Sequence, residues 1–313
     1  MTRSLLTLLL ITVLAYTGIW NAGFVWDDVP LIVQNKAFED GLTWSMFTGD
    51  LWADSGAGQV ASGYYRPLVL LSFALDRAVF GMSPGGYHLH SLLWHCAAIW
   101  GLWRLLVPMV GDRGALVGSA LFALHPVQSE VVIWISARND LMAAAFGFAA
   151  LDCIWKNEAP SRGRMVSALI LTVAAAMSKE TAFVLPLMAG LALSNQSHRL
   201  MRIAPLMLGV GVVIGVRVVV GVGGSVTPSL QGWTLLLESS PTLAGILGAS
   251  VMSPWPLSSA RDLSWIGGTP VWRGVLGWAF IVTLGVTWLR ASERRLVGVG
   301  LGWSALLVGV TWV

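Results

Sequence analysis

The sequence predicts an all-α, polytopic membrane protein, and three observations support this fold class. The chain has 313 residues, of which 56% are hydrophobic and only 11% are charged. Soluble domains carry about 25% charged residues, so this chain has too few to cover a water-exposed surface. It also contains 17 tryptophans, whose amphipathic rings favour the membrane–water interface. These features exclude a soluble enzyme, a disordered segment and a nucleic-acid-binding domain.

The apolar stretches predict about nine transmembrane helices, because one crossing needs about 20 apolar residues. The first candidate runs from Leu5 to Trp20, and we interpret it as a retained helix and not as a signal peptide. The other candidates lie at about 89–109, 115–133, 135–155, 165–178, 181–194, 203–220, 274–289 and 296–313. We interpret 233–256, which Glu238 and prolines interrupt, as a broken or re-entrant segment on the outer side. The whole chain, 1–313, is then one transmembrane domain.

The charges predict the orientation. Basic residues fall at alternate connectors, which the positive-inside rule places in the cytoplasm. These connectors hold 11 of the 19 basic residues: Arg3, Arg104, Arg113, Lys156, Arg162, Arg164, Arg199, Arg202, Arg290, Arg294 and Arg295. Of the 16 acidic residues, 12 fall on the other side. We therefore expect Met1 inside, Val313 outside, and a working face at the outer surface of a bacterial inner membrane.

The connector 23–88 is much longer than the others. Loops beyond about 12–15 residues are usually functional or disordered. This outer loop contains a Gly/Ser-rich run at 55–63 and an amphipathic stretch from Arg66 to Phe80. We expect it to lie on the membrane surface as short helices.

An acidic pair, Asp27-Asp28, follows directly on the first helix. Two adjacent like charges are costly, because they must share one site. The pair is either a solvated helix end or a general base held close to the membrane surface. The pair alone does not decide between these readings.

A second cluster lies around the outer turn between the third and fourth spans, and it contains His125, Glu130, Arg138 and Asp140. Ionisable residues at the apolar boundary mark a functional site or a buried ion pair. The structural alternative here is a pair of Arg138 with Asp140 or with Glu130. His125 precedes a proline, where a capping role is the commoner one.

Further cations fall on the same outer side. Lys179 splits an apolar stretch, where it could neutralise a lipid-linked phosphate as a point charge or form a salt bridge with Glu180. Arg66 could grip phosphate with its bidentate fork, and the preceding Tyr65 is a further phosphate contact or an interface anchor. The two cysteines lie in apolar segments without a CxxC motif, so neither zinc nor redox chemistry is indicated.

Six motifs follow in a fixed order over about residues 20–260. They are Phe24-Val-Trp-Asp-Asp28, Tyr65-Arg-Pro-Leu68, Gly86-Tyr-His88, His125-Pro-Val-Gln-Ser-Glu130, Ala137-Arg-Asn-Asp140 and Ser178-Lys-Glu180. This order resembles the transmembrane and tetratricopeptide-repeat O-mannosyltransferases and, more broadly, the GT-C glycosyltransferases. The resemblance implies transfer of a sugar from a polyprenyl-phosphate donor to a hydroxyl acceptor, a protein Ser/Thr or a glycolipid, at the outer face.

The resemblance also implies roles for individual residues. Asp27 would be the base that deprotonates the acceptor, and Asp28 would orient it or hold a divalent cation. Glu130, Arg138, Asp140 and His125 would orient acceptor or donor, and Arg66, Lys179 and Tyr65 would contact phosphate. Whether a metal is used stays open.

The chain departs from this pattern because no tetratricopeptide-like array is visible in it. Acceptor recognition would then lie in the outer loop or in a partner membrane subunit. The alternative function is a catalytically silent GT-C-like scaffold subunit of a membrane complex. A transporter would need polar residues at mid-membrane, and within 203–220 only Arg217 qualifies.

Overall fold

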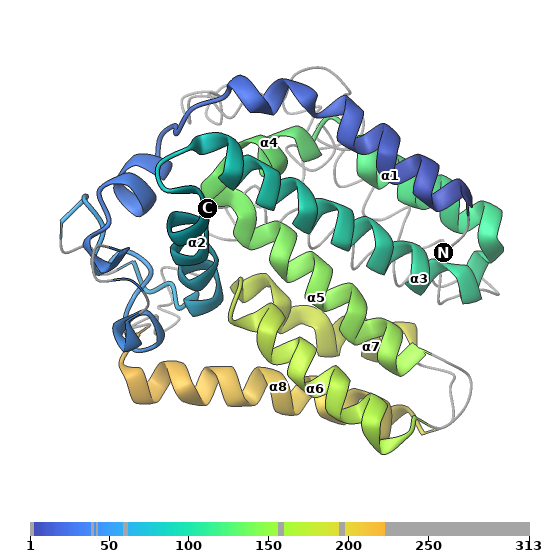
Figure 1. Ribbon diagram of the computed structural model, residues 1–313. Coiled ribbons are helices and arrows are strands. Elements are labelled where there is room, and N and C mark those ends of the chain that lie inside the picture. The colour runs from blue at the N-terminus through green and yellow to red at the C-terminus, as the bar shows by residue number, and fades with distance from the viewer. Residues whose placement is uncertain are drawn as a thin grey trace, which may run out of the picture. The chain divides into compact units, whose positions relative to one another are not determined.

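The computed structural model describes residues 3–38, 41, 43–58, 62–155, 160–193 and 198–222. These residues form helices and connectors without a strand, as the predicted fold class requires (Figure 1). Three stretches are long and apolar enough to cross a membrane: Arg3–Asn21, Pro84–Leu124 and Arg199–Val220. They support a membrane protein. The predicted spans 274–289 and 296–313 and the interrupted segment 233–256 lie outside the described residues, so the count of nine crossings stays a prediction.

Long α-helices and short helical turns make up the described part of the chain. In chain order they are α1 (Arg3–Ala15), η1 (Thr17–Asn21), η2 (Val29–Val33), η3 (Lys36–Phe38), η4 (Trp44–Phe47), α2 (Pro67–Phe80), α3 (Pro84–Leu124), α4 (Gln128–Ile133), η5 (Ile135–Ala137), α5 (Arg138–Trp155), α6 (Arg162–Ala176), η6 (Glu180–Val184), α7 (Leu185–Ala192) and α8 (Arg199–Val220). Both α2 and α3 begin with a proline, whose missing N–H costs nothing in the first helical turn.

Two interruptions set the length of the helices after residue 109. Gly111 has φ 72° and divides α3 into two helices, at the connector that the sequence predicts between 109 and 115. The predicted span 115–133 is wrong at its end, because α3 stops at Leu124 and α4 is a separate short helix. His125 is extended at φ −64° and ψ 132°, since the following Pro126 disfavours helical backbone in the residue before it.

The long helices pack in a row. The helix α3 contacts α1 and α5, α5 contacts α6, and α6 contacts α8 (Figure 1). The helices α6 and α8 approach each other closely at Gly209. A Cβ atom added to this glycine would lie 2.9 Å from Thr172 Cβ and 3.2 Å from the Leu169 carbonyl oxygen. Small residues at such crossings let membrane helices come close together.

The outer loop forms short helices, as predicted, and these have an apolar core of their own. Buried side chains from η2, η3, η4 and α2 pack against Tyr87 of α3, Ile135 of η5 and Met142 of α5. In Figure 1 the loop and α2 lie beside the ends of the helices on the side where α5 begins. The side chain of Trp44 remains 78% exposed. Contact of this loop with a membrane surface stays a prediction.

The close approach at Gly209 gives a stability prediction. Alanine at Gly209 should destabilise the protein, because overpacking costs about 1–3 kcal/mol and a backbone oxygen is among the neighbours. Alanine at Gly211, which has nothing within 4 Å among the described residues, should instead gain about 1 kcal/mol of helix propensity. Thermal unfolding of both variants in detergent checks this. Equal shifts in Tm would contradict the described α6–α8 packing.

Candidate active site

Three polar residues at the junction of η5 and α5 hold three other segments of the chain. Ser136 binds Asp28 of the outer loop, Arg138 binds Asp76 of α2, and Asp140 binds Lys179 before η6. Segments far apart in the sequence are thereby joined at one place. The cluster that the sequence predicts at 125–140 thus lies beside two others, the acidic pair and Lys179.

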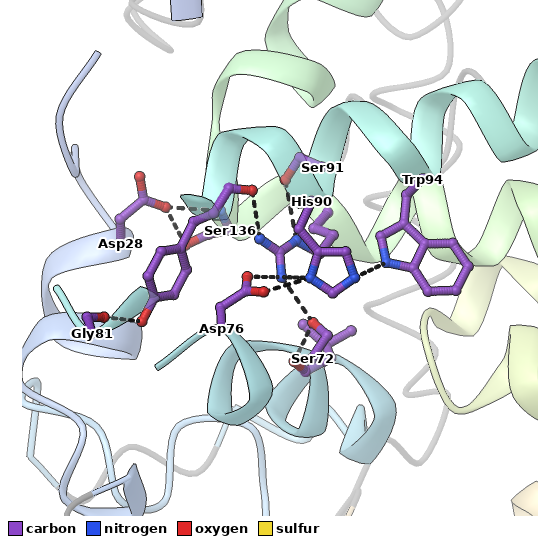
Figure 2. Close-up of polar contacts among 11 residues, drawn as sticks. Asp28, Ser72, Asp76, Gly81, His90, Ser91, Trp94 and Ser136 are labelled. Atoms are coloured by element: carbon purple, nitrogen blue, oxygen red, sulfur yellow. Dashed lines mark hydrogen bonds and ion pairs between the residues drawn. The ribbon is translucent and has the colours of Figure 1, made fainter. Parts of the chain in front are cut away.

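Asp28 is a buried anchor. Its Oδ1 accepts hydrogen bonds from the Ser136 backbone N–H at 2.8 Å and from the Ser136 hydroxyl at 2.6 Å. These two bonds are drawn in Figure 2. Asp28 Oδ2 accepts a third from the Val25 N–H at 3.0 Å. Burial raises the pKa of Asp28, and the bonds from Ser136 and Val25 oppose that rise. Both oxygens are therefore engaged in holding the loop to η5.

Asp27 has a different environment. Its side chain is half-buried and makes no hydrogen bond or ion pair with any other described residue. Burial raises the pKa of Asp27, and the neighbouring charge of Asp28 raises it further. A carboxylate that is open on one side and has a raised pKa is suited to accept a proton.

The backbone just before Asp27 is strained. Trp26 has φ 47°, in the left-handed region that bulky residues rarely adopt. Its ring meets that of Trp134 edge to face, with centroids 5.8 Å apart. Such strain persists only where the surrounding structure fixes it, and it is commonest at functional sites. Here the Trp134 contact and the Asp28 anchor hold Asp27 between them.

Arg138 is fully buried, and each nitrogen of its guanidinium has a partner. Nη1 lies 2.5 Å from Asp76 and donates to Ser72 Oγ at 3.2 Å. Nε donates to Ser91 Oγ at 3.1 Å, and Nη2 donates to the Tyr87 carbonyl at 2.8 Å. This network joins α5 to α2 and α3 (Figure 2). The structural pairing expected with Glu130 or Asp140 is wrong, because Asp76 fills that role.

His90 completes this buried network. Its Nδ1 lies 2.6 Å from Asp76 Oδ1, and its Nε2 accepts a hydrogen bond from Trp94 Nε1 at 3.0 Å. Trp94 Nε1 can only donate, so Nε2 of His90 accepts this bond and Nδ1 is the nitrogen that faces Asp76. Asp76 therefore makes a hydrogen bond to His90 of α3 and an ion pair to Arg138 of α5, and these two contacts fix the place of α2.

Lys179 is 2% exposed, and its Nζ lies 2.8 Å from each carboxylate oxygen of Asp140. The alternative pairing with Glu180 is wrong, since adjacent side chains face different ways. Tyr65 is also buried, and its hydroxyl donates to the Phe47 carbonyl at 2.9 Å. Both groups therefore have internal partners.

Arg66 has a carboxylate partner as well. Its Nε and Nη2 each lie 2.9 Å from Glu180 Oε2, and the other oxygen of Glu180 lies 2.9 Å from Arg217 Nη1. Arg217 Nη2 also donates to the Gly63 carbonyl at 2.7 Å. This contact brings the end of α8 to the outer loop.

Glu130 and His125 lie beside this cluster. Glu130 is half-buried, and burial together with the charge of Asp140 raises its pKa. His125 Nδ1 accepts a hydrogen bond from the Val127 N–H at 3.1 Å, which is a capping arrangement before α4. This geometry agrees with the capping reading of His125.

Sequence reasoning missed Asp76 and gave Arg217 no role. The signal for Asp76 was present, because it is the one acidic residue in α2, which is otherwise largely apolar. Arg217 is likewise a charged residue near the end of an apolar helix. Such residues mark buried pairs or sites by default.

The described residues contain no group of three His, Cys, Asp or Glu side chains that could hold a metal ion. Asp28 in addition takes N–H and O–H donors on both oxygens. That donor set fits a structural anchor and does not fit a ligand to a divalent cation.

The Arg138–Asp76 pair gives a further stability prediction. Asp76→Asn should cost about 3–5 kcal/mol, because it leaves a buried guanidinium without its counter-charge. The matched control is Asp152→Asn, which breaks the Arg104–Asp152 pair at 2.8 Å, where Arg104 is 41% exposed. That change should cost about 1 kcal/mol or less. Thermal unfolding in detergent measures both, and similar losses would contradict the buried network.

Searches against known proteins find relatives over about half of the chain. The chain is 32% identical over 180 residues to "Protein O-mannosyl-transferase Tmtc1" of Drosophila melanogaster, covering 56% of this chain and 21% of that protein. It is 32% identical over 177 residues to Tmtc2 of the same organism, covering 53% and 19%. Human TMTC1 is 36% identical over 134 residues, covering 42% and 15%. No protein-family model and no solved structure matches.

The matched part spans about a fifth or less of the length of these relatives. They come from animals and lend no support to the expectation of a bacterial inner membrane. The predicted resemblance is confirmed: this chain is similar to the TMTC protein O-mannosyltransferases.

Proposed function

We propose that this chain is a glycosyltransferase that moves a sugar from a polyprenyl-phosphate donor to a hydroxyl acceptor, a protein Ser/Thr or a glycolipid. Similarity to proteins named O-mannosyltransferases supports the reaction class. The observation that carries the proposal is the difference in environment between the two carboxylates of the acidic pair. Asp28 is fixed by three hydrogen bonds, while the carboxylate of Asp27 beside it has no partner among the described residues.

The chemistry needs a base of this kind. A neutral hydroxyl is a poor nucleophile, and a positioned base contributes about 10²–10⁴-fold to its reaction. In the proposed step, Asp27 takes the proton of the acceptor hydroxyl while the hydroxyl oxygen bonds to the anomeric carbon. The bond from that carbon to the phosphate oxygen breaks, and the phosphate leaves with the electron pair. The raised pKa of Asp27 makes it a stronger proton acceptor than an ordinary aspartate.

The leaving phosphate needs cations, and two candidates, Arg66 and Lys179, lie in this cluster. Asp140 balances Lys179 one to one, whereas Arg66 shares Glu180 with a second arginine. The pair of arginines therefore suits phosphate better than Lys179 does, because among the described residues the two arginines share one carboxylate and keep one unbalanced positive charge. The Tyr65 hydroxyl stabilises the outer loop through its hydrogen bond to the Phe47 carbonyl.

The proposed working face is the outer one. All the residues of the candidate site belong to connectors or helix ends on the side that the positive-inside rule places outside. The Arg104–Asp152 pair lies on helices α3 and α5 on the opposite, inner side of that topology.

The alternative, a catalytically silent scaffold, also has an observation in its favour. Arg138, Lys179 and Arg66 all have internal carboxylate partners, so these cations are accounted for without any substrate. Asp27 is the residue whose placement a scaffold does not explain. Measurement of sugar transfer separates the two functions.

The first functional prediction concerns Asp27→Asn. The full chain carrying this change should transfer mannose from a polyprenyl-phosphate donor to a Ser/Thr peptide at least about 100-fold more slowly, because the amide cannot act as a base. Asp54→Asn, at an exposed position of the same loop, is the matched control and should transfer normally. Unchanged transfer by both Asp27→Asn and Asp28→Asn would refute the catalytic assignment, and no transfer by the unmodified chain would favour the scaffold.

The second concerns pH. Transfer requires ionised Asp27, so its rate should fall as the pH drops through the raised pKa of that carboxyl. Asp28→Asn removes the neighbouring negative charge and should lower the pKa of Asp27, while the amide oxygen that it introduces can still accept from Ser136. The acid limb of the pH–rate profile should therefore move to lower pH. Movement to higher pH would show that another group titrates.

A further inference from the structure

Two arginines share one carboxylate at the end of α8. Glu180 Oε2 binds the fork of Arg66 through Nε and Nη2, both at 2.9 Å, and Glu180 Oε1 binds Arg217 Nη1 at 2.9 Å. Two cations and one anion leave a surplus of one positive charge. The other ion pairs with lysine or arginine among the described residues, Lys179–Asp140, Arg138–Asp76 and Arg104–Asp152, are balanced one to one.

Each of the two guanidiniums also has a contact other than Glu180. Arg66 is 3% exposed and lies 4.3 Å from the centroid of the Tyr64 ring. Arg217 lies 5.9 Å from the Phe183 ring and donates to the Gly63 carbonyl. Aromatic faces and a carbonyl therefore help to hold both forks, in addition to the carboxylate.

Glu180 is the most accessible member of this triad. Its side chain is 24% exposed, against 17% for Arg217 and 3% for Arg66. Within the described part of the chain, its side-chain hydrogen bonds and ion pairs are the ones to these two arginines. A rotation of the Glu180 side chain would thus leave the two forks free for another anion.

A phosphate group fits the same two forks, because its oxygens accept guanidinium N–H groups in the same bidentate way as a carboxylate. We infer that Glu180 occupies the phosphate position of the donor lipid while the site is empty, and that the phosphate displaces it on binding. This inference rests on the proposed function. After transfer, the return of Glu180 would compete with the product lipid phosphate and promote its release.

The experiment measures binding and needs no catalysis. Isothermal titration of the full chain in detergent, with a short polyprenyl phosphate as the probe, should show about tenfold tighter binding for Glu180→Gln, because a competing negative charge is removed. Arg217→Gln keeps the Arg66–Glu180 pair and should bind about tenfold more weakly, because the surplus charge is lost. Asp152→Asn removes the carboxylate of an arginine pair away from the site and should leave the affinity unchanged.

Two results would overturn the inference. One is unchanged or weaker binding of polyprenyl phosphate by Glu180→Gln, and the other is unchanged binding by Arg217→Gln. The second variant keeps the test decisive if Glu180→Gln does not fold.

The source of the phosphate is tested by competition. Inorganic phosphate and phosphatidylglycerol, added at the concentration of the probe, should fail to displace the polyprenyl phosphate. Displacement by either would overturn the assignment to a polyprenyl-linked phosphate. Because no transfer is measured, a chain that binds as predicted but shows no transferase activity would contradict the proposed function alone.

Discussion

Charge pairing at the start of α5 is the interaction on which the rest of this site depends. Removing a charged group from water costs several kcal/mol, so a buried ion must be paired and hydrogen-bonded. Arg138 and Asp140 meet this requirement by pairing with Asp76 and Lys179, and Ser136 hydrogen-bonds the buried carboxylate of Asp28. The outer loop, α2 and the segment before η6 are held by these bonds, together with the apolar core beneath the loop.

The same constraint explains how the acidic pair divides its roles. Adjacent side chains cannot both face the anchor, and Asp28 takes it with both oxygens. Asp27 is left half-buried, beside a negative charge and after a strained Trp26. The anchor thus fixes the position of Asp27, while burial and, after it, the charge of Asp28 raise the pKa of this carboxyl, as suits a general base. Most cations of the cluster, by contrast, are balanced by carboxylates, and the surplus charge lies where Glu180 bridges two arginines.

The sequence alone predicted the helical class and most of the described long helices to within a few residues. The length and composition of the apolar stretches suffice to predict these helices. The end of α3 before Pro126 can be predicted only when the effect of proline on the preceding residue is considered. Partner choice could not be predicted, since it depends on which helices pack together. Arg138 therefore binds Asp76 of α2 and not the nearby Asp140. Arg217 gained its role only through the contact of α8 with the outer loop.

The central claim is that Asp27 is an open, reactive carboxylate next to an engaged one. Carbodiimide labelling of the folded full chain in detergent, mapped by mass spectrometry, tests it most directly, because carbodiimides attack accessible protonated carboxyls. Asp27 should be labelled at mildly acidic pH, where its raised pKa keeps a fraction protonated, and Asp28 and Asp76, which are buried and bonded, should remain unlabelled. Labelling of Asp28 as fast as Asp27, or an unreactive Asp27, would contradict the account.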